Sequence, residues 1–402
     1  MSCATPASGE SESVDWQGIV RESRRRLDEF GPQAAPAIES ELEVLIAQLA
    51  AETGPASSVS TAVGRAEAWL LLGQLREMQS SPEKLTSAID AYVAAGEVAR
   101  GLSPRQVMLA AMNRGNALGK LARFDAAVVA YDEALEGHSR IEADDPALAL
   151  SLGALHLNRG AALQSLPSPD LERAMQGFQN AIEALERVGQ SAATGPAEKQ
   201  QARYLLAGTR LNLAVSLLER DFANVEQASV LTAAVGESVR ATQTEALSAA
   251  DFAMRALRLA CEIGGRKIAA LNPAARSEIA RALNDCTDAA EEALALAAHW
   301  ERRDVSIFRP AVSWFIAFAS ALYAHHQPHF LGEFLVDVLR SASTPQAWVD
   351  AVELDGVALR AIDAAQNGLR GWLFHEPQSA DAERHVEALE SLRRARQQFE
   401  KR

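Results

Sequence analysis

Two segments of this sequence place asparagine next to arginine and glycine. The amide groups of these asparagines are the side chains that are best suited to bind a ligand. The segment MNRGNALGKL at 112–121 has an echo, LNRGAAL, at 157–163. In the first copy, Asn113, Asn116 and Lys120 recur at the spacing that brings residues to one face of an α-helix. A side-chain amide carries both donors and an acceptor, so it can bind the backbone of an extended peptide of any sequence. The pattern therefore favours recognition over catalysis.

Metal binding and catalysis have weaker support. His325, His326 and His329 lie close together in YAHHQPHF, but Pro328 breaks the helical register that would bring two of them to one face. A turn at a helix end is the favoured interpretation of this segment. The chain has no GxSxG, no glycine-rich phosphate loop and no HExxH motif. We predict no metal and no cofactor, and an active site assembled from distant helices ranks last among the hypotheses.

The amino-acid composition and the net charge limit the fold classes and the kinds of partner that are possible for this chain. Of the 402 residues 48% are hydrophobic, but only 5% are aromatic, and runs of alternating Val, Ile or Thr are nearly absent. These features predict an all-α protein. The formal net charge of −14 argues against a nucleic-acid partner, because phosphate binding needs an excess of Lys and Arg on one face.

Membrane insertion and secretion are also disfavoured. The longest uncharged apolar run, 311–324, is shorter than the roughly 20 residues that span a bilayer. The N-terminus has no basic segment followed by an apolar core, and the three cysteines form no disulfide framework. We therefore predict a cytoplasmic location. Cys261 and Cys286 fall on Ala-rich helical segments, where cysteine behaves as a small apolar residue.

Helix starts are marked by a capping residue followed by proline. Ser, Asp, Asn or Thr can accept a hydrogen bond from the first turn, and proline at the next position loses no intrahelical bond. These pairs are Ser81-Pro82, Ser103-Pro104, Asp145-Pro146, Ser168-Pro169, Asn272-Pro273 and Thr344-Pro345, with Gly195-Pro196 as a weaker case. Their intervals predict one helix or one helical hairpin each.

A small residue and an aromatic residue repeat across these intervals. The small residues are Gly73, Gly115, Gly160 and Ala214, and the aromatic ones are Tyr92, Tyr131 and Phe178. We predict two-helix hairpins in which the small residue lets the first helix approach the second, while the ring fills the space between repeats. A single hairpin cannot bury its apolar faces, so neighbouring hairpins must stack. In the fourth unit, we expect a long connection before the second helix resumes near Ala250.

The segment MNRGNALGKLARFDAAVVAYDEALE at 112–136 resembles the tetratricopeptide repeat family. The resemblance is good over 66–190 and weaker over 200–263. It implies a right-handed superhelix whose concave surface is lined by the first helices, with Asn113, Asn158 and Asn212 stacked as a ladder. The candidate peptide-binding residues on that surface are Leu71, Gln74, Met112, Asn113, Asn116, Lys120, Asn158, Gln164 and Asn212.

Two alternatives remain for these polar residues. The asparagines could bond to the backbone of the adjacent repeat and hold the stack, and Arg114 and Arg159 are expected to span between helices and pair with acidic neighbours. Some family members capture a C-terminal carboxylate with Lys, Asn and Arg on successive first helices. Asn113, Asn116 and Lys120 could contribute to such a clamp, but the third helix has Gly208 and Asn212 where the clamp needs cations. That departure disfavours a receptor for C-terminal tails.

The sequence divides into four expected regions. These are a disordered N-terminus at 1–14, a helical pair at 15–60, a repeat array at 61–265 and further helices at 266–402. The resemblance implies a non-catalytic module that binds a peptide or a partner protein in its groove. The alternative is a structural subunit that contacts partners, or a second copy of itself, through the aromatic-rich C-terminal helices.

Overall fold

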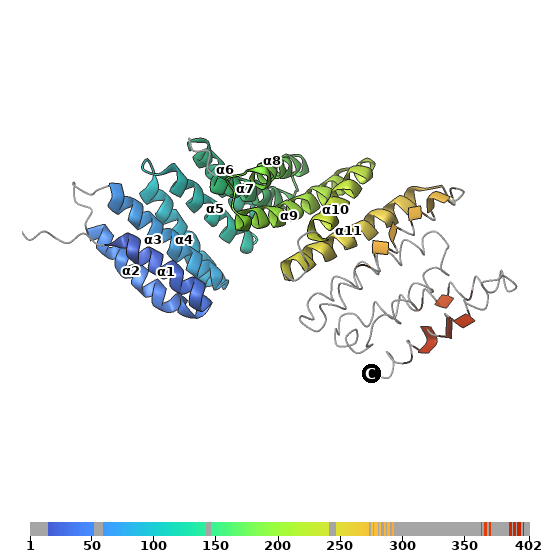
Figure 1. Ribbon diagram of the computed structural model, residues 1–402, viewed down its shortest axis with the longest axis horizontal. Coiled ribbons are helices and arrows are strands. Elements are labelled where there is room, and N and C mark those ends of the chain that lie inside the picture. Colours follow the sequence, from blue (N-terminus) through green and yellow to red (C-terminus); the bar gives the residue numbers. More distant parts are fainter. Residues whose placement is uncertain are drawn as a thin grey trace, which may run out of the picture. The chain divides into compact units, whose positions relative to one another are not determined.

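The computed structural model describes residues 15–51, 59–141, 146–240 and 247–272, together with scattered residues between 275 and 397 (Figure 1). Every regular element within the four continuous ranges is an α-helix or a short 3-10 helix, which confirms the all-α class. In the described residues, no helix is both long and apolar enough to cross a membrane. The expectations for 1–14, for most of 266–402 and for His325, His326 and His329 concern residues outside those described.

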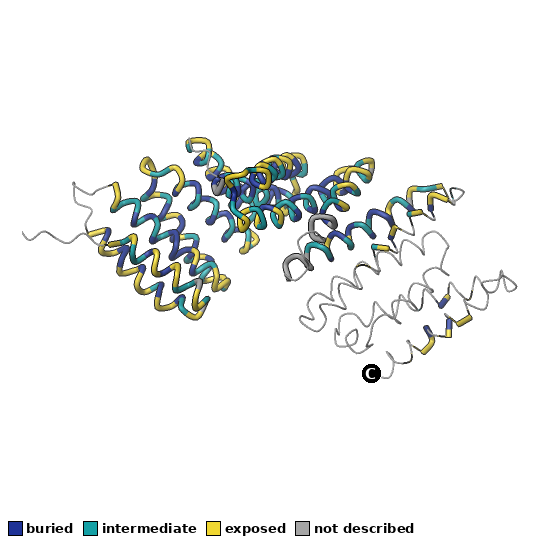
Figure 2. The backbone as a smooth tube through the Cα atoms, viewed as in Figure 1, coloured by how far each residue is buried: buried dark blue, intermediate teal, exposed yellow. Residues whose placement is uncertain are grey.

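The chain consists of two compact units, residues 1–202 and 203–402. The division falls within α9 (Pro196–Arg220), a continuous helix of 25 residues. It also falls inside the range 61–265, for which the sequence led us to expect one repeat array. Figure 2 shows that buried and exposed residues alternate along the described helices, as stacking of amphipathic elements requires.

The first unit begins with two helices that cover the start of the repeats. These are α1 (Trp16–Phe30) and α2 (Ala35–Ala51), which lie in the range 15–60. Three hairpins follow, and each packs against the next (Figure 1). They are formed by α3 (Val59–Met78) with α4 (Pro82–Ala99), α5 (Pro104–Lys120) with α6 (Phe124–Ser139), and α7 (Pro146–Gln164) with α8 (Leu171–Gln190).

Each hairpin is closed by a contact between its own glycine and ring, a pairing that the sequence interpretation did not make because it placed the ring between repeats. A Cβ atom on Gly115 would lie 2.5 Å from Tyr131 Cε1, and one on Gly160 would lie 2.6 Å from Phe178 Cε1. The third pair, Gly73 with Tyr92, is equally close, and all three rings are buried. No side chain larger than hydrogen fits at these positions, so the repeated spacing in the sequence reflects direct packing.

Most of the predicted helix starts agree with the structure, and one is shifted. The hydroxyl groups of Ser81 and Ser103 accept hydrogen bonds from the first turns of α4 and α5, at 3.2 Å and 3.3 Å. The helices α7 and α9 also begin at the predicted prolines. Ser168-Pro169 was expected to start α8, but the cap is Asp170, whose carboxylate accepts the bond at 3.1 Å. A carboxylate is the better cap here because it also interacts favourably with the helix dipole.

The second unit contains a helix that the sequence interpretation missed. After α9 come α10 (Val225–Arg240) and α11 (Leu247–Ala270), where a long connection up to Ala250 had been expected. The three helices share one apolar cluster, which includes Leu211 and Ala214 of α9, Val235 of α10 and Leu259 of α11. The segment of α10 is rich in Val, Ser and Thr, which have modest helix propensity, so burial against its neighbours stabilises it.

Candidate functional site

The arginines of the two Asn-Arg-Gly segments join helices, as expected. Arg114 Nη2 lies 2.7 Å from Glu133 Oε2, which pairs the two helices of one hairpin. Arg159 Nε lies 2.6 Å from Asp132 Oδ1, which pairs α7 with α6 of the preceding hairpin. These ion pairs involve side chains that are partly exposed, so each contributes little to stability and mainly fixes the alignment of the helices.

The asparagines of the first unit also bond to other repeats. Asn116 Oδ1 accepts two hydrogen bonds, one from the Tyr131 hydroxyl at 2.9 Å and one from Asn158 Nδ2 at 3.0 Å. Asn158 therefore bonds to Asn116 and not to Asn113, which is only 8% exposed. The Asn158–Asn116 bond joins the first helices of neighbouring hairpins, as the stacking alternative requires, but it runs between two side chains and not to the backbone of the adjacent repeat.

Lys120 takes part in a second polar network, which joins α5 to α3 and α4 of the preceding hairpin. Its Nζ atom lies 2.9 Å from Glu77 Oε1, and Glu77 Oε2 accepts a hydrogen bond of 2.7 Å from the Tyr92 hydroxyl. Burial, together with the carboxylate of Glu77, raises the pKa of both Tyr92 and Tyr131. Both phenols therefore stay protonated at neutral pH and act as hydrogen-bond donors.

The remaining candidates of the first unit lie in different environments. Leu71 is 2% exposed and packs in the cluster that α3 forms with α1 and α2, so it is out of reach of a ligand. Gln74 is exposed and Met112 is half-buried. Gln164 is half-buried and already has an interaction partner. The first-unit candidates thus do not form one continuous binding surface.

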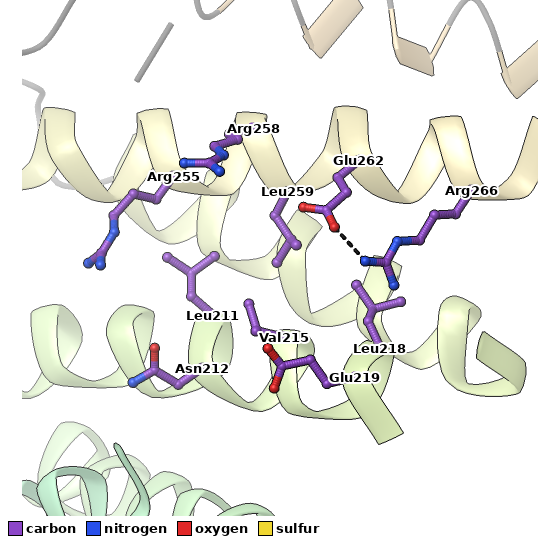
Figure 3. Close-up of a pocket in the computed structure, with 10 residues that line it drawn as sticks. All are labelled: Leu211, Asn212, Val215, Leu218, Glu219, Arg255, Arg258, Leu259, Glu262 and Arg266. Atoms are coloured by element: carbon purple, nitrogen blue, oxygen red, sulfur yellow. Dashed lines mark hydrogen bonds and ion pairs between the residues drawn. The ribbon is translucent and has the colours of Figure 1, made fainter. Parts of the chain in front are cut away.

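Asn212 lines a groove in the second unit (Figure 3). This α9–α11 groove has a cavity volume of about 300 Å³, and its lining residues come from those two helices. Its floor is aliphatic and consists of Leu211, Val215 and Leu218 of α9 with Leu259 of α11. The three leucines are each 6% exposed, so the floor is densely packed but still reached by solvent.

Charged side chains surround this floor. Arg266 Nη2 lies 2.6 Å from Glu262 Oε1, so these two charges balance each other. Arg255 and Glu219 also line the groove, and each has an interaction partner. Arg258 is exposed and has no partner in the part of the chain that the structure describes. The groove therefore combines an aliphatic floor, an amide and one unpaired cation.

Sequence reasoning identified Asn212 but missed the other side of this groove. Arg255, Leu259, Glu262 and Arg266 recur at the spacing of one helical face, which is a signal that the sequence does contain. The opposing helix itself was expected, because the second helix of the fourth unit was predicted to resume near Ala250. What the sequence did not indicate was α10 between the two helices, or which of their faces line a cavity.

Metal and thiol chemistry have no visible basis in the described residues. No group of three or more His, Cys, Asp or Glu side chains in these residues could hold a metal ion. Cys261 and Cys286 are buried side by side, and the Cys261 thiol donates to the Cys286 carbonyl at 3.5 Å. Burial raises the pKa of the Cys286 thiol to about 12, so it is protonated at neutral pH and a weak nucleophile.

Comparisons with known proteins add little to this geometry. No protein-family model matches the chain, and no curated protein matches it. Among solved structures, BtubC (BKLC) from P. vanneervenii is 15% identical, with a TM-score of 0.37 over 75% of this chain and 89% of that one. The apo form of the quorum sensor NprR from B. thuringiensis is 13% identical, with a TM-score of 0.42 over 94% and 98%. A Rap protein complexed with Competence and Sporulation Factor is 13% identical, with a TM-score of 0.35 over 96% and 98%. Such distant likenesses assign no family and no function.

Proposed function

We propose that this chain is a non-catalytic binding protein that holds a segment of a peptide or partner protein in the α9–α11 groove. One observation carries the proposal: an aliphatic floor bordered by an amide and charged groups encloses a cavity of about 300 Å³. Binding sites commonly combine a mainly apolar surface with a few polar groups that fix the ligand's orientation. The volume suits a few side chains of a larger partner.

The shape of the groove suits a short stretch of chain. On α9 the floor residues Leu211, Val215 and Leu218 span about 10 Å, at a rise of 1.5 Å per residue. An extended peptide advances by about 3.3 Å per residue, so three or four of its residues would cover that floor. The half-buried amide of Asn212 at the edge can bond to the backbone of such a peptide.

The first unit has a supporting role in this proposal. Asn116, Asn158 and Lys120 are engaged with Tyr131 and Glu77, and these contacts align the hairpins. We therefore place the main binding surface at the α9–α11 groove and not on the stripe formed by these residues.

A peptide selection tests the proposal without knowledge of the natural partner. A library of random peptides would be displayed on phage and selected on the immobilised full-length chain. The peptides obtained would then be measured by fluorescence anisotropy against two variants. Val215→Glu places a carboxylate in the groove floor, while Val230→Glu makes the same change on α10 at a side chain that is 69% exposed.

We expect the selected peptides to lose at least tenfold in affinity for Val215→Glu and to keep their affinity for Val230→Glu. Circular dichroism at the measuring temperature would show whether both variants remain helical. If Val215→Glu unfolds, Asn212→Leu takes its place as the groove variant. Equal binding by the wild type and a folded groove variant would overturn the proposal, as would a selection that yields no binding peptide.

A further inference from the structure

The two ends of the α9–α11 groove differ in charge. Figure 3 shows Asn212, Arg255 and Arg258 toward one end, and Glu219, Glu262 and Arg266 toward the other. Among the described residues, the first end is lined by two arginines and an amide, and one of these arginines, Arg255, has an interaction partner. The second end has two carboxylates and one arginine, which pairs with Glu262 at 2.6 Å. Within a chain whose formal net charge is −14, the first end thus holds an arginine, Arg258, with which no described residue pairs.

We infer that the groove selects a partner segment in which aliphatic side chains are followed by a carboxylate that binds Arg258. This inference rests on the proposed function and adds the chemistry of the ligand. Arg258 is exposed and has no partner among the described residues, whereas the other charged groove residues each have one. A guanidinium group presents several N–H donors in one plane and matches both oxygens of a carboxylate.

Arg258 and Leu259 line the same groove, so one ligand can meet both a charged and an apolar side chain of α11. Leu259 belongs to the floor, and Arg258 precedes it on the same helix. In Figure 3, Arg258 lies along α11 at the end of the groove that also holds Asn212 and Arg255. A ligand on the aliphatic floor that extends toward this end would bring a carboxylate to Arg258. The apolar contact supplies most of the affinity, and the charge pair supplies the selectivity.

Asn212 adds a second reason to expect a segment of polypeptide. It lies at the same end as Arg258, and its amide can bond to a peptide N–H or C=O group beside the acidic residue. A free aliphatic acid would fill the floor and reach Arg258, but it has no backbone for Asn212 to bind. The geometry thus favours an internal acidic segment of a protein.

Matched peptides test this inference on the full-length chain. They would be eight residues long and fluorescently labelled, with two central leucines flanked on one side by Asp, Asn or Lys, in both orders. Both ends would be blocked, so that no terminal carboxylate or amine contributes. Anisotropy titrations would use the wild type, Arg258→Gln, Arg258→Glu and, as a control, Arg100→Glu at the exposed end of α4.

We expect the wild type to bind the Asp peptide about three- to tenfold more tightly than the Asn peptide at low salt, with a smaller ratio at high salt. Arg258→Gln should remove this preference, Arg258→Glu should shift it to the Lys peptide, and Arg100→Glu should leave it unchanged. Circular dichroism would verify that all variants are folded.

Four results would contradict the inference in distinguishable ways. If Asp, Asn and Lys peptides bind equally well to the wild type, the charge selectivity is absent and the proposed function still stands. If no peptide of the set binds at millimolar concentration while the selected library peptides do, the ligand chemistry is wrong. Displacement of the Asp peptide by an equal concentration of 4-methylpentanoate would mean that the groove takes a free aliphatic acid. Failure of the library peptides as well would remove the proposed function itself.

Discussion

Asn158 donates a hydrogen bond from Nδ2 to Asn116 Oδ1 across 3.0 Å, and this contact joins the first helices of two successive hairpins. The same oxygen accepts the hydroxyl of Tyr131 from the second helix of its own hairpin. One amide thus connects three helices. An amide that could have bonded to a ligand is used instead to fix how the repeats align.

The coupling between Asn116 and Asn158 can be measured by a double-mutant cycle. We expect Asn116→Ala and Asn158→Ala each to lower the free energy of unfolding by about 1 kcal/mol, with a coupling of roughly 0.5–1.5 kcal/mol. Urea denaturation followed by circular dichroism would give these values. Asn180→Ala is the control, because its only described partner is Gln176 one turn earlier on α8, and it should cost a few tenths of a kcal/mol. Strict additivity of the first two changes would show that the hydrogen bond contributes nothing.

Two glycine substitutions should have opposite effects on stability. A methyl group on Gly115 would overlap the Tyr131 ring, so Gly115→Ala should lower the free energy of unfolding by about 1–3 kcal/mol. Gly189 lies in α8, and a Cβ atom at this position would have no heavy atom within 4 Å. Gly189→Ala should therefore raise the free energy of unfolding by up to about 1 kcal/mol. Thermal unfolding of the wild type and the two variants would measure these changes in stability. A Gly115→Ala variant as stable as the wild type would mean that the glycine–ring contact is loose.

A residue with positive φ after α5 offers a stabilising change. Ala122 has φ of 55°, a conformation that costs an L-residue energy and that glycine adopts freely. Ala122→Gly should therefore raise the free energy of unfolding by about 0.5–1 kcal/mol. The reverse is expected for Ala94→Gly inside α4, where glycine destabilises a helix by a similar amount. Denaturant titration of both variants tests this, and a loss of stability at Ala122 would contradict it.

His156 should make the stability of the first unit depend on pH below neutrality. Burial lowers the pKa of its imidazole to about 4, with smaller effects from Arg159 and His138. In the unfolded chain the pKa is about 6.5, so between these values the unfolded state binds more protons. Stability should therefore decrease as the pH falls from about 6.5 to 4 and should show no contribution from this group above pH 7.

The comparison of His156→Gln with the wild type isolates that effect. We expect the difference in unfolding free energy to be constant above pH 7 and to shift in favour of the variant as the pH falls below 6.5. His138→Gln serves as the matched change, and its effect should be weaker because His138 is less buried. Parallel stability curves for the wild type and His156→Gln over the whole range would rule out this role.

The sequence predicted the features that depend on nearby residues. Helix starts at Ser81 and Ser103 follow from capping chemistry within one turn. The close approach of two helices at Gly115 follows from the repeated small residue, although its direct contact with the Tyr131 ring was not predicted. The role of Arg159 as a link between helices was also correct. In each case the interacting groups lie within one repeat or in adjacent helices, so a regular spacing was enough to identify them.

The features that the sequence did not predict depend on distant segments. Leu71 was placed on a binding surface because the repeat pattern contains no information about α1 and α2, which pack against α3 and bury it. The α9–α11 groove was missed although a helix was expected to resume near Ala250, because the repeat pattern did not show which faces of the two helices meet. The helix α10 was not predicted either, since its segment has modest helix propensity and folds through burial. Arg258 becomes a candidate ligand contact only because it lines that groove.

The glycine–ring contacts also bear on how the chain folds during synthesis. Gly73, Gly115 and Gly160 each meet a ring that is less than one hairpin away in the sequence. Contacts with such short separation close small loops and form quickly. We therefore expect each hairpin to have its interior filled as soon as its own second helix leaves the ribosome, so that the growing chain exposes only one unpaired apolar face at a time to chaperones.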